Sequence, residues 1–297
     1  MGIEELEKWK EAGKLAHDAL HFGKELIKEN QSMLNVTEKI EKYVFDNGGK
    51  LAFPTNLAIN NVGAHWTPSS KTKDNFKKGD LVKLDVGVHI DGYIGDNALT
   101  VEIGTNKYAR LIETSREALN AAIEVAGPGI NVGMIGYAVQ TTIENRGYKP
   151  IANLTGHGIK RYNLHSGISI PNVKENGGSI LKAGDIIAIE PFVTDGAGRV
   201  GGKRNSNIYH VRQIRNIRDE KAANMIDEIQ HRYKGLPFAE RWLHQIQEVD
   251  ATRSLTKLMR AGIISYYPVL DELGSGMVAQ SEHTVLITNS GSEVLTN

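Results

Sequence analysis

The stretch GDLVKLDVGVHIDGYIGD, residues 79–96, decides the fold of this chain. Residues 81–88 alternate with the period of two that is typical of a β-strand. The Asp91-Gly92 dipeptide that follows favours a two-residue hairpin turn, because such a turn needs positive φ angles. With that turn as the loop, Gly87 faces Asp96 across the hairpin. The sequence therefore predicts a pair of antiparallel strands around which the rest of the chain is organised.

The predicted hairpin carries two carboxylates on one face. Asp85 lies two residues from Gly87, so its side chain points to the same face as that of Asp96. The two acids are then diagonal neighbours, with Cα atoms about 7–8 Å apart. They suit one shared divalent ion or two bridged ions, although two exposed strand residues would give the same pattern. Because Asp85 stands among apolar residues, where an unpaired charge is costly to bury, we expect partners elsewhere in the chain.

The composition is that of a globular protein, and it limits the ligands that a metal site could use. The chain has 297 residues, 40% hydrophobic and 24% charged, which is ordinary for a globular protein. Lysine plus arginine and aspartate plus glutamate number 35 each, which argues against specific nucleic-acid binding. With no cysteine, any metal ion must be held by oxygen atoms and imidazole nitrogens. The acidic N-terminus lacks a signal core and no apolar run approaches the ~20 residues of a membrane span, so we expect a cytoplasmic protein.

Helices are predicted before and after the hairpin. An apolar stripe with spacings of three and four predicts a helix over residues 3–29. The capping box Asn35-x-x-Glu38 predicts the start of a second helix, which ends near residues 47–49. Two further helices are predicted over residues 108–123 and about 132–145.

The segment GDIIAIE, residues 184–190, repeats the pattern of GDLVKLD, residues 79–85. Each has a Gly-Asp turn, four strand residues and a carboxylate, and each follows two helices, a strand and a histidine-bearing loop. We interpret this as an internal duplication whose copies pair about a pseudo-twofold axis. The pairing would bring Asp85 and Glu190 to one place, and Asp96 would have no counterpart in the second copy.

Residues from about 205 to 268 interrupt the duplication. Apolar stripes at residues 222–233 and 255–263 predict helices there. The sequence therefore predicts an inserted helical subdomain, residues 205–268, within a duplicated domain formed by residues 1–204 and 269–297.

The candidates for chemistry are four carboxylates and three histidines. The carboxylates and one imidazole suit two divalent ions, which about 3.5–4 Å apart can activate a water and polarise a carbonyl. Each residue alone has a plainer interpretation, such as a turn histidine in a glycine-rich loop or a solvent-facing glutamate. The candidates are Asp85, Asp96, His157, Glu190 and Glu282, with His65 and His165 nearby in the pattern.

Several short motifs between residues 53 and 284 carry a resemblance to a known family, which runs from the first helix to about Thr288. They are FPTN (53–56) with AHWTP (64–68), GHGI (156–159) with Tyr162 and His165, IEPF (189–192), LPF (236–238) with Arg241-Trp242, and AQSEHT (279–284). Through them the chain resembles the type II methionine aminopeptidases of archaea and eukaryotes, and the archaeal members in particular. The resemblance implies the pita-bread fold, an α/β (α+β) architecture of two related halves with a curved antiparallel sheet flanked by helices.

The resemblance also implies roles for the candidate residues. Asp85 and Asp96 would ligate one metal ion, with Asp96 and Glu282 bridging, while His157 and Glu190 complete the second site. Glu190 is the implied proton shuttle. The ions would be two divalent cations per chain, Co2+, Mn2+, Fe2+ or Zn2+.

The implied substrates are N-terminal methionine peptides and nascent polypeptides with a small second residue. His65 and His165 should contact the substrate and stabilise the tetrahedral intermediate. Phe53, Phe192 and Tyr267 should form the methionine side-chain pocket, with ordinary core packing as the alternative. We expect a monomer, and the ribosome is a further candidate partner.

Two departures from the family pattern and two rival functions remain. Ser281 stands where the family commonly has an aromatic residue, which alters the expected wall beside Glu282, and Trp66 stands where tyrosine is usual. The rivals are a proline-directed peptidase and a non-enzymatic binding protein on the same fold. The insertion argues against the first rival, and the intact ligand positions argue against the second.

Overall fold

The structure, a computed structural model, describes residues 2–244 and 251–297. In the first half of the fold, two helices precede a set of short strands and a long hairpin. These elements are α1 (Ile3–Leu26), α2 (Met33–Asp46), β1 (Lys50–Leu51), β2 (Asn56–Ile59), β3 (Val62–Ala64), β4 (Leu81–Ile90) and β5 (Tyr93–Glu102).

The second half repeats this order of helices, short strands and a strand that follows a Gly-Asp turn. Its elements are α3 (Ala109–Val125), α4 (Val132–Asn145), β6 (Lys149–Pro150), β7 (Thr155–Ile159), β8 (Ser169–Pro171), β9 (Ile186–Ile189), β10 (Phe192–Thr194) and β11 (Val200–Gly201).

The remaining elements include the segment predicted as an insertion, of which residues 245–250 lie outside the described residues. They are β12 (Asn205–Val211), α5 (Glu220–Tyr233), β13 (Phe238–Ala239), α6 (Glu240–Leu243), α7 (Ala251–Arg260), β14 (Ile264–Pro268), β15 (Leu270–Glu272), β16 (Val278–Gln280), β17 (His283–Ile287) and β18 (Ser292–Val294).

The hairpin of β4 and β5 forms as its sequence predicts. Asp91 and Gly92 have φ angles of 49° and 89°, and the strands pair along their whole length. Gly87 lies opposite Asp96 and Asp85 opposite Ala98, which is the diagonal arrangement expected for the two acids. On its other edge, β4 pairs with β2 and, nearer the hairpin turn, with β1.

The two halves begin their long strands with the same turn. The Gly79 N–H donates to the Ile103 carbonyl oxygen at 2.7 Å, and the Gly184 N–H donates to the Ile287 carbonyl oxygen at 2.8 Å. Both glycines have positive φ angles, of 88° and 93°. Ile103 follows β5 and Ile287 ends β17, so the pair β4–β5 in one half corresponds to the pair β9–β17 in the other.

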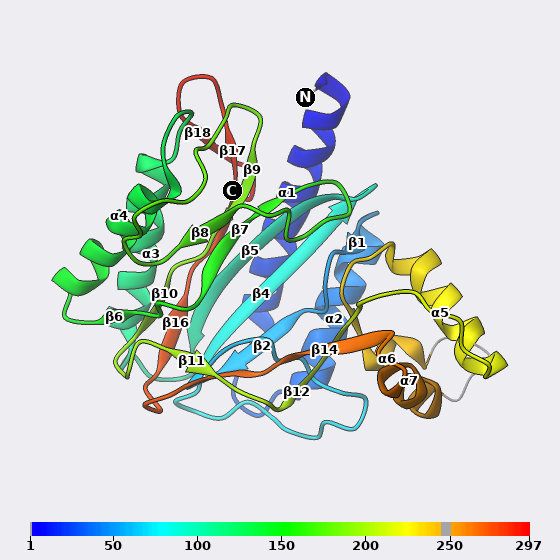
Figure 1. Cartoon of the computed structure of the whole chain (residues 1–297). Helices are drawn as coiled ribbons and strands as arrows, with labels where there is room; N and C mark the ends of the chain where they lie inside the picture. The colour runs from blue at the N-terminus through cyan, green and yellow to red at the C-terminus, as the bar shows by residue number, and fades with distance from the viewer. Residues whose placement is uncertain (1, 245–250) are drawn as a thin grey trace.

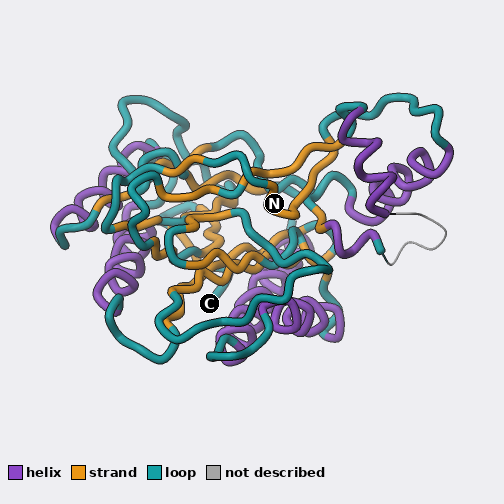
Figure 2. The backbone as a smooth tube through the Cα atoms, turned by 90° about the horizontal axis from the view of Figure 1, so that it is seen from below, coloured by secondary structure: helices purple, strands orange, loops and turns teal. Residues whose placement is uncertain are grey.

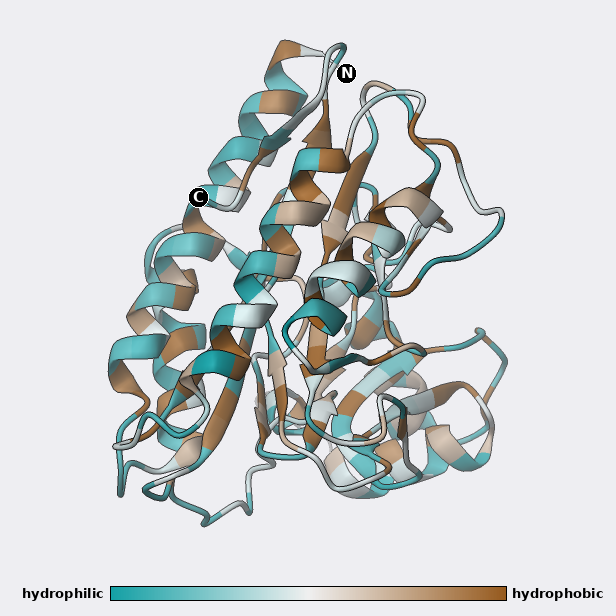
Figure 3. Cartoon of the chain, turned by 90° about the vertical axis from the view of Figure 1, so that its left-hand side faces the viewer, coloured by the Kyte–Doolittle hydropathy of each residue, from teal (hydrophilic) through white to brown (hydrophobic). Residues whose placement is uncertain are grey.

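Helices α1 and α2 pack on strands of the first half, and α3 and α4 pack on strands that include β6, β8, β10 and β16. In Figure 1, α1 lies behind β4 and β5, and α2 contacts α1, β1 and β2. Figures 1 and 2 both place α3 and α4 at one end of the molecule and α5 to α7 at the opposite end. Figure 3 shows helices with alternating hydrophilic and hydrophobic residues lying over strands that are mostly hydrophobic. Among the residues that the structure describes, no helix combines the length and apolar character that crossing a lipid bilayer requires.

The segment between β12 and β14 shares its core with the first half. Met225 of α5, Phe238 of β13 and Leu258 of α7 belong to the same buried apolar cluster as Ile40 of α2 and Leu84 of β4. A second cluster joins α3 and α4 to β9 and β17. The helices of the segment contact one another and strands β12 to β14, and their buried apolar residues continue the core of the first half.

Two predicted helix ends differ from the observed ones. Helix α1 ends at Leu26, three residues earlier than expected. Helix α2 begins at Met33, and its N-cap is Ser32, whose side chain accepts from the Asn35 N–H at 3.4 Å. The capping box predicted at Asn35 is wrong, because Ser32 already satisfies that N–H group and leaves Asn35 inside the helix.

Candidate metal centre

The five predicted ligands come from both halves and line one cavity. Asp85 lies in β4 and Asp96 in β5, while His157 lies in β7. Glu190 stands between β9 and β10, and Glu282 between β16 and β17. Each therefore comes from a strand or from the residue next to one, which fixes its direction relative to the others.

Distances within this cluster are short. His157 Nε2 lies 3.6 Å from Asp96 Oδ2 and 3.7 Å from Glu190 Oε1. One ligand atom each from Asp96, His157 and Glu282 lie within 4.8 Å of one another. Asp85 joins the cluster through β4, diagonally across from Asp96. The structure thus brings together all five residues.

The two halves contact each other through two similar sets of hydrogen bonds, each between a threonine hydroxyl and the backbone of the other half. The Asp96 N–H donates to Thr284 Oγ1 at 2.8 Å, and that hydroxyl donates to the Asp96 carbonyl oxygen at 2.9 Å. The Gln280 N–H donates to Thr100 Oγ1 at 2.8 Å, and that hydroxyl donates to the Gln280 carbonyl oxygen at 2.7 Å. The two pairs are counterparts, so Asp96 does have a counterpart in the second half, contrary to expectation, and it is Gln280.

Gln280 is a site residue that the sequence argument missed. Its Nε2 donates to Glu190 Oε2 at 3.3 Å and to Glu282 Oε2 at 3.4 Å. A carboxylate at this position would repel both glutamates, whereas the amide holds them together. The signal was present in the sequence, because Gln280 lies two residues before Glu282 and strand alternation points both to one face.

Burial and mutual repulsion raise the pKa values of the carboxyl groups. Burial raises the pKa of Asp85 to about 7. Burial, and then repulsion by neighbouring carboxylates, raises the pKa values of Asp96, Glu190 and Glu282 well above their ordinary range. Burial lowers the pKa of His157 to about 3, so its imidazole is neutral at pH 7 and has a lone pair to offer.

The donor set fits divalent cations. The Oδ1 atoms of Asp85 and Asp96 are buried and have no hydrogen-bond partner within residues 2–244 and 251–297. Enclosed carboxylates that lack partners are costly unless a cation neutralises them. Carboxylate oxygen and neutral imidazole are ligands that Mn, Fe, Co and Zn all accept.

The residues predicted to contact substrate divide into two groups. His65, His165, Phe53 and Tyr267 line the same cavity as the cluster. The His165 ring lies 4.5 Å from that of His157, and the His65 ring lies 5.2 Å from that of Tyr267. The cavity is also lined by residues to which the sequence assigned no role, and these are Asn56, Ala64, Leu164, Ile208 and Pro237.

Phe192 is not brought to this cavity. Its side chain is buried in a separate apolar cluster with Ile151, Val200 and Val278. Pro191 separates Glu190 from Phe192, and Phe192 begins β10, which belongs to a different sheet from β9. Strand alternation from Glu190 therefore does not carry over to Phe192.

The two departures from the family pattern, Ser281 and Trp66, do not line the cavity. The Ser281 hydroxyl lies 2.8 Å from that of Ser115 in α3, so it faces the helix rather than the cavity. Trp66 is partly buried against the apolar cluster of the first half, and its carbonyl oxygen accepts from the Leu57 N–H at 2.9 Å. Ser281 therefore does not form the expected wall beside Glu282.

Comparison with known proteins shows the family of the chain and several relatives of similar length. The model of metallopeptidase family M24 matches residues 7–289. A methionine aminopeptidase of Methanocaldococcus jannaschii is 44% identical over 296 residues, covering 100% of both chains. A methionine aminopeptidase of Archaeoglobus fulgidus is 42% identical over the same span and coverage. The crystal structure of a methionine aminopeptidase from Thermotoga maritima gives a TM-score of 0.73 at 26% identity, covering 100% of this chain and 98% of that one.

Proposed function

The chain belongs to metallopeptidase family M24, and from that premise we propose that it removes the N-terminal methionine from nascent polypeptides with two divalent metal ions. The observation that carries the proposal is the cluster of four carboxylates and a neutral imidazole in one cavity. Its full-length relatives that bear the name methionine aminopeptidase support the activity.

Five residues would hold the ions. Asp85 and Asp96 would hold one, His157 and Glu190 would complete the second, and Asp96 and Glu282 would bridge. When bound, such ions supply an activated water and polarise the scissile carbonyl. Co2+, Mn2+, Fe2+ and Zn2+ all suit the ligands. Gln280, which donates to both Glu190 and Glu282, would hold these two carboxylates in the orientation that the ions require.

Glu190 is suited to move the proton of the reaction. Its Oε2 accepts from Gln280, while its Oε1 faces His157. Burial, and then the neighbouring Asp85, raises its pKa well above the ordinary value, so this carboxyl group holds a proton more readily than an exposed glutamate does. Glu190 would take a proton from the attacking water and deliver it to the leaving amine.

His65 and His165 would hold the substrate carbonyl. Burial lowers the pKa of His65 to about 4 and also lowers the pKa of His165, so both rings are neutral at pH 7. A neutral imidazole has one N–H to donate and one nitrogen to accept. Each can therefore donate one hydrogen bond to the carbonyl oxygen as charge develops there.

The methionine side chain would lie against the apolar wall of the cavity. Phe53 and Tyr267 form part of this wall, together with Leu164, Ile208 and Pro237. The preference for a small second residue is proposed from the resemblance to the methionine aminopeptidases. We further propose that the protein is a cytoplasmic monomer that acts on nascent chains, with the ribosome as a candidate partner. We also propose that residues 205–268 form an inserted helical subdomain.

Peptide hydrolysis tests this function against its rivals. Metal-loaded protein should release methionine from Met-Gly-Met and leave Ala-Pro intact. Glu190→Gln should lower kcat by about 100-fold or more, because a proton-transfer group contributes about 10²–10⁴-fold. Glu144→Gln is the matched control: Glu144 is exposed on α4, where its side chain accepts from Gln140, and its loss should leave kcat unchanged.

Two outcomes would contradict the proposal. Cleavage of Ala-Pro without methionine release would favour the proline-directed peptidase. Metal binding with no hydrolysis of either peptide would favour the binding protein.

A further inference from the structure

A closed loop brings His165 to the catalytic cavity. Residues 160–168 connect β7, which carries His157, to β8. Within the loop, the Lys160 N–H donates to the Asn163 carbonyl oxygen at 2.9 Å, and the Asn163 N–H donates back to the Lys160 carbonyl oxygen at 2.8 Å. The loop is therefore fixed internally, and its placement depends on what holds it from outside.

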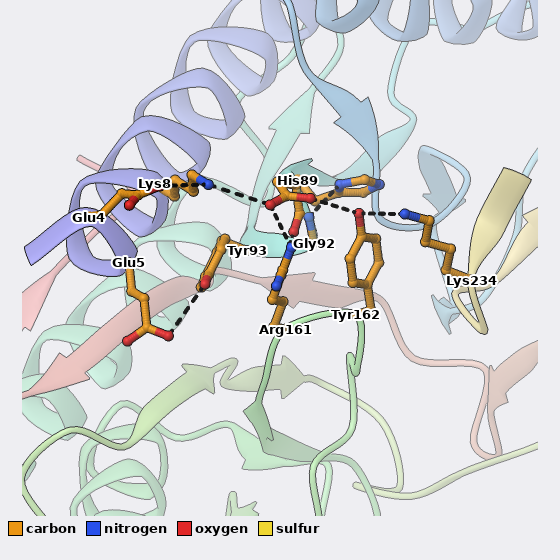
Figure 4. A network of polar contacts seen from close by, with 10 residues as sticks. Glu4, Glu5, Lys8, His89, Gly92, Tyr93, Arg161, Tyr162 and Lys234 are labelled. Carbon is orange, nitrogen blue, oxygen red and sulfur yellow. Dashed lines mark hydrogen bonds and ion pairs between the residues drawn. The ribbon is translucent and has the colours of Figure 1, made fainter. Parts of the chain in front are cut away.

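The turn of the β4–β5 hairpin holds this loop (Figure 4). Arg161 donates from Nε to the Asp91 carbonyl oxygen at 2.9 Å and from Nη2 to Asp91 Oδ2 at 2.5 Å. The Tyr162 N–H donates to the Gly92 carbonyl oxygen at 2.8 Å, and the Tyr162 hydroxyl donates to Asp91 Oδ1 at 3.3 Å. Lys8 of α1 reaches the same carboxylate at 3.4 Å. The hairpin that carries Asp85 and Asp96 thus also anchors the loop of His165.

Tyr162 is the residue that these contacts constrain most. Its φ angle is 54°, a left-handed conformation that a bulky residue adopts only where surrounding contacts enforce it. Its ring lies over Gly92, where an added Cβ would come within 2.3 Å of the ring. Lys234, which follows α5, donates to the Tyr162 hydroxyl at 3.2 Å and lies 4.7 Å from the ring centroid.

We propose that Tyr162 is a positioning residue that places His165 in the catalytic cavity. The proposal rests on the function proposed above, in which His165 contacts the substrate. Tyr162 does not line the catalytic cavity; it lines a separate cavity of about 740 Å³ together with His89 and Lys234. It therefore acts through the loop, three residues before His165, and not by touching the substrate.

The kinetic test is a double-variant cycle on the metal-loaded full chain with Met-Gly-Met. Tyr162→Ala should lower kcat and kcat/KM alike, by about tenfold, and leave KM within about twofold, because the His165 contact strengthens in the transition state. In the His165→Ala background the same change should have no further effect. Tyr162→Phe keeps the ring over Gly92 and should restore most of the activity. Equal losses in both backgrounds would overturn the proposal.

A matched pair of glycine variants tests the contact of the Tyr162 ring with Gly92 without substituting any residue of the loop. Gly92→Ala should reproduce the loss of kcat. Gly79→Ala is its control, because Gly79 has a φ angle of 88° against 89° at Gly92 but nothing within 4 Å of an added Cβ. We expect Gly79→Ala to leave kcat within about twofold. Equal effects of the two variants would overturn the proposal, since backbone strain alone would then explain the loss.

Trypsin cleavage separates failure of this proposal from failure of the proposed function. Lys160 and Arg161 are trypsin sites inside the loop, and the contacts with Asp91 and Gly92 protect them. Tyr162→Ala and Gly92→Ala should be cut there about tenfold faster than the wild type and Gly79→Ala. Equal cutting of all four proteins, with an active wild type, overturns the positioning role alone. A wild type that releases no methionine overturns the proposed function, whatever the cleavage rates.

Discussion

Asp85 is the carboxylate whose protonation links the metal centre to pH. Its pKa is raised from 3.8 to about 7 because burial disfavours the charged form. In the metal-free protein, the folded state therefore prefers the protonated Asp85 carboxyl. The stability that this preference gives is fully present below about pH 4 and is lost as the pH rises through about 7. A metal ion reverses this preference, because it binds only the ionised carboxylate.

Metal affinity should accordingly rise with pH. Below about pH 7, each binding event must displace the proton of Asp85, so the apparent affinity for Mn2+ should rise at least about tenfold per pH unit. The raised pKa values of Asp96, Glu190 and Glu282 act in the same direction. Calorimetry at pH 6 and pH 7, in two buffers of different ionisation enthalpy, measures both affinity and proton release. An affinity that is the same at both pH values would contradict the account.

Strand alternation explains which site residues the sequence could predict. Asp85 and Asp96 belong to one hairpin with a recognisable turn, so their shared face follows from local sequence alone. Gln280, Ser281 and Glu282 follow the same rule, which places the serine toward α3 and the other two toward the cavity. What no local pattern gives is the bridge between Ala98 and Glu282, which are 184 residues apart and paired only by the tertiary fold.

At the scale of elements, a buried ion pair joins α2 to α6. The Arg241 guanidinium donates to Glu41, and both side chains are almost fully buried. The Trp242 Nε1–H and the Thr55 N–H donate to the same carboxylate at 2.9 and 3.3 Å. Arg241 also donates to the Pro68 carbonyl oxygen at 2.8 Å. The pair therefore ties the helical segment to the chain that leads from Phe53 into the cavity.

Removing one partner of this pair should destabilise the protein strongly. Glu41→Ala should lower the free energy of unfolding by about 3–5 kcal/mol, because it leaves the Arg241 charge buried without a counterion. Asp46→Ala, on the same helix, breaks an exposed pair with Lys42 and should cost at most about 1 kcal/mol. Urea unfolding of the two variants measures the difference. Equal losses would show that burial of the Glu41 pair has no energetic consequence.

The helices were the elements most readily predicted, and their ends the least. The spacing of apolar residues predicted a helix over about 132–145, and α4 spans Val132–Asn145. The start of α2 was predicted at the Asn35 capping box, but Ser32 is the N-cap, and its hydroxyl accepts a hydrogen bond from the Asn35 N–H. Phe192 was misplaced for a related reason, because Pro191 ends one strand and a new sheet begins beyond it.

At the scale of the whole molecule, duplication explains both the site and its asymmetry. The two halves repeat the same turns and the same threonine contacts, so the sheets converge on one cavity. Gln280 in place of a second Asp96 leaves four carboxylates and an amide that links two of them. The long connection from β9 to β17, which contains the helical segment, replaces the two-residue turn of the first half. The repeated turns could be recognised in the sequence. The correspondence of β17 to β5 could not, because the helical segment separates β17 from β9 in the chain.

The most direct test of the account combines metal stoichiometry with methionine release. Metal-stripped protein is titrated with Mn2+ by calorimetry, and samples along the titration are assayed with Met-Gly-Met. We predict about two ions per chain, no activity in the stripped protein, activity that returns as the ions bind, and loss of at least one ion in Asp85→Ala. Full methionine release by the stripped protein, or an Asp85→Ala variant that binds both ions and stays active, would contradict it.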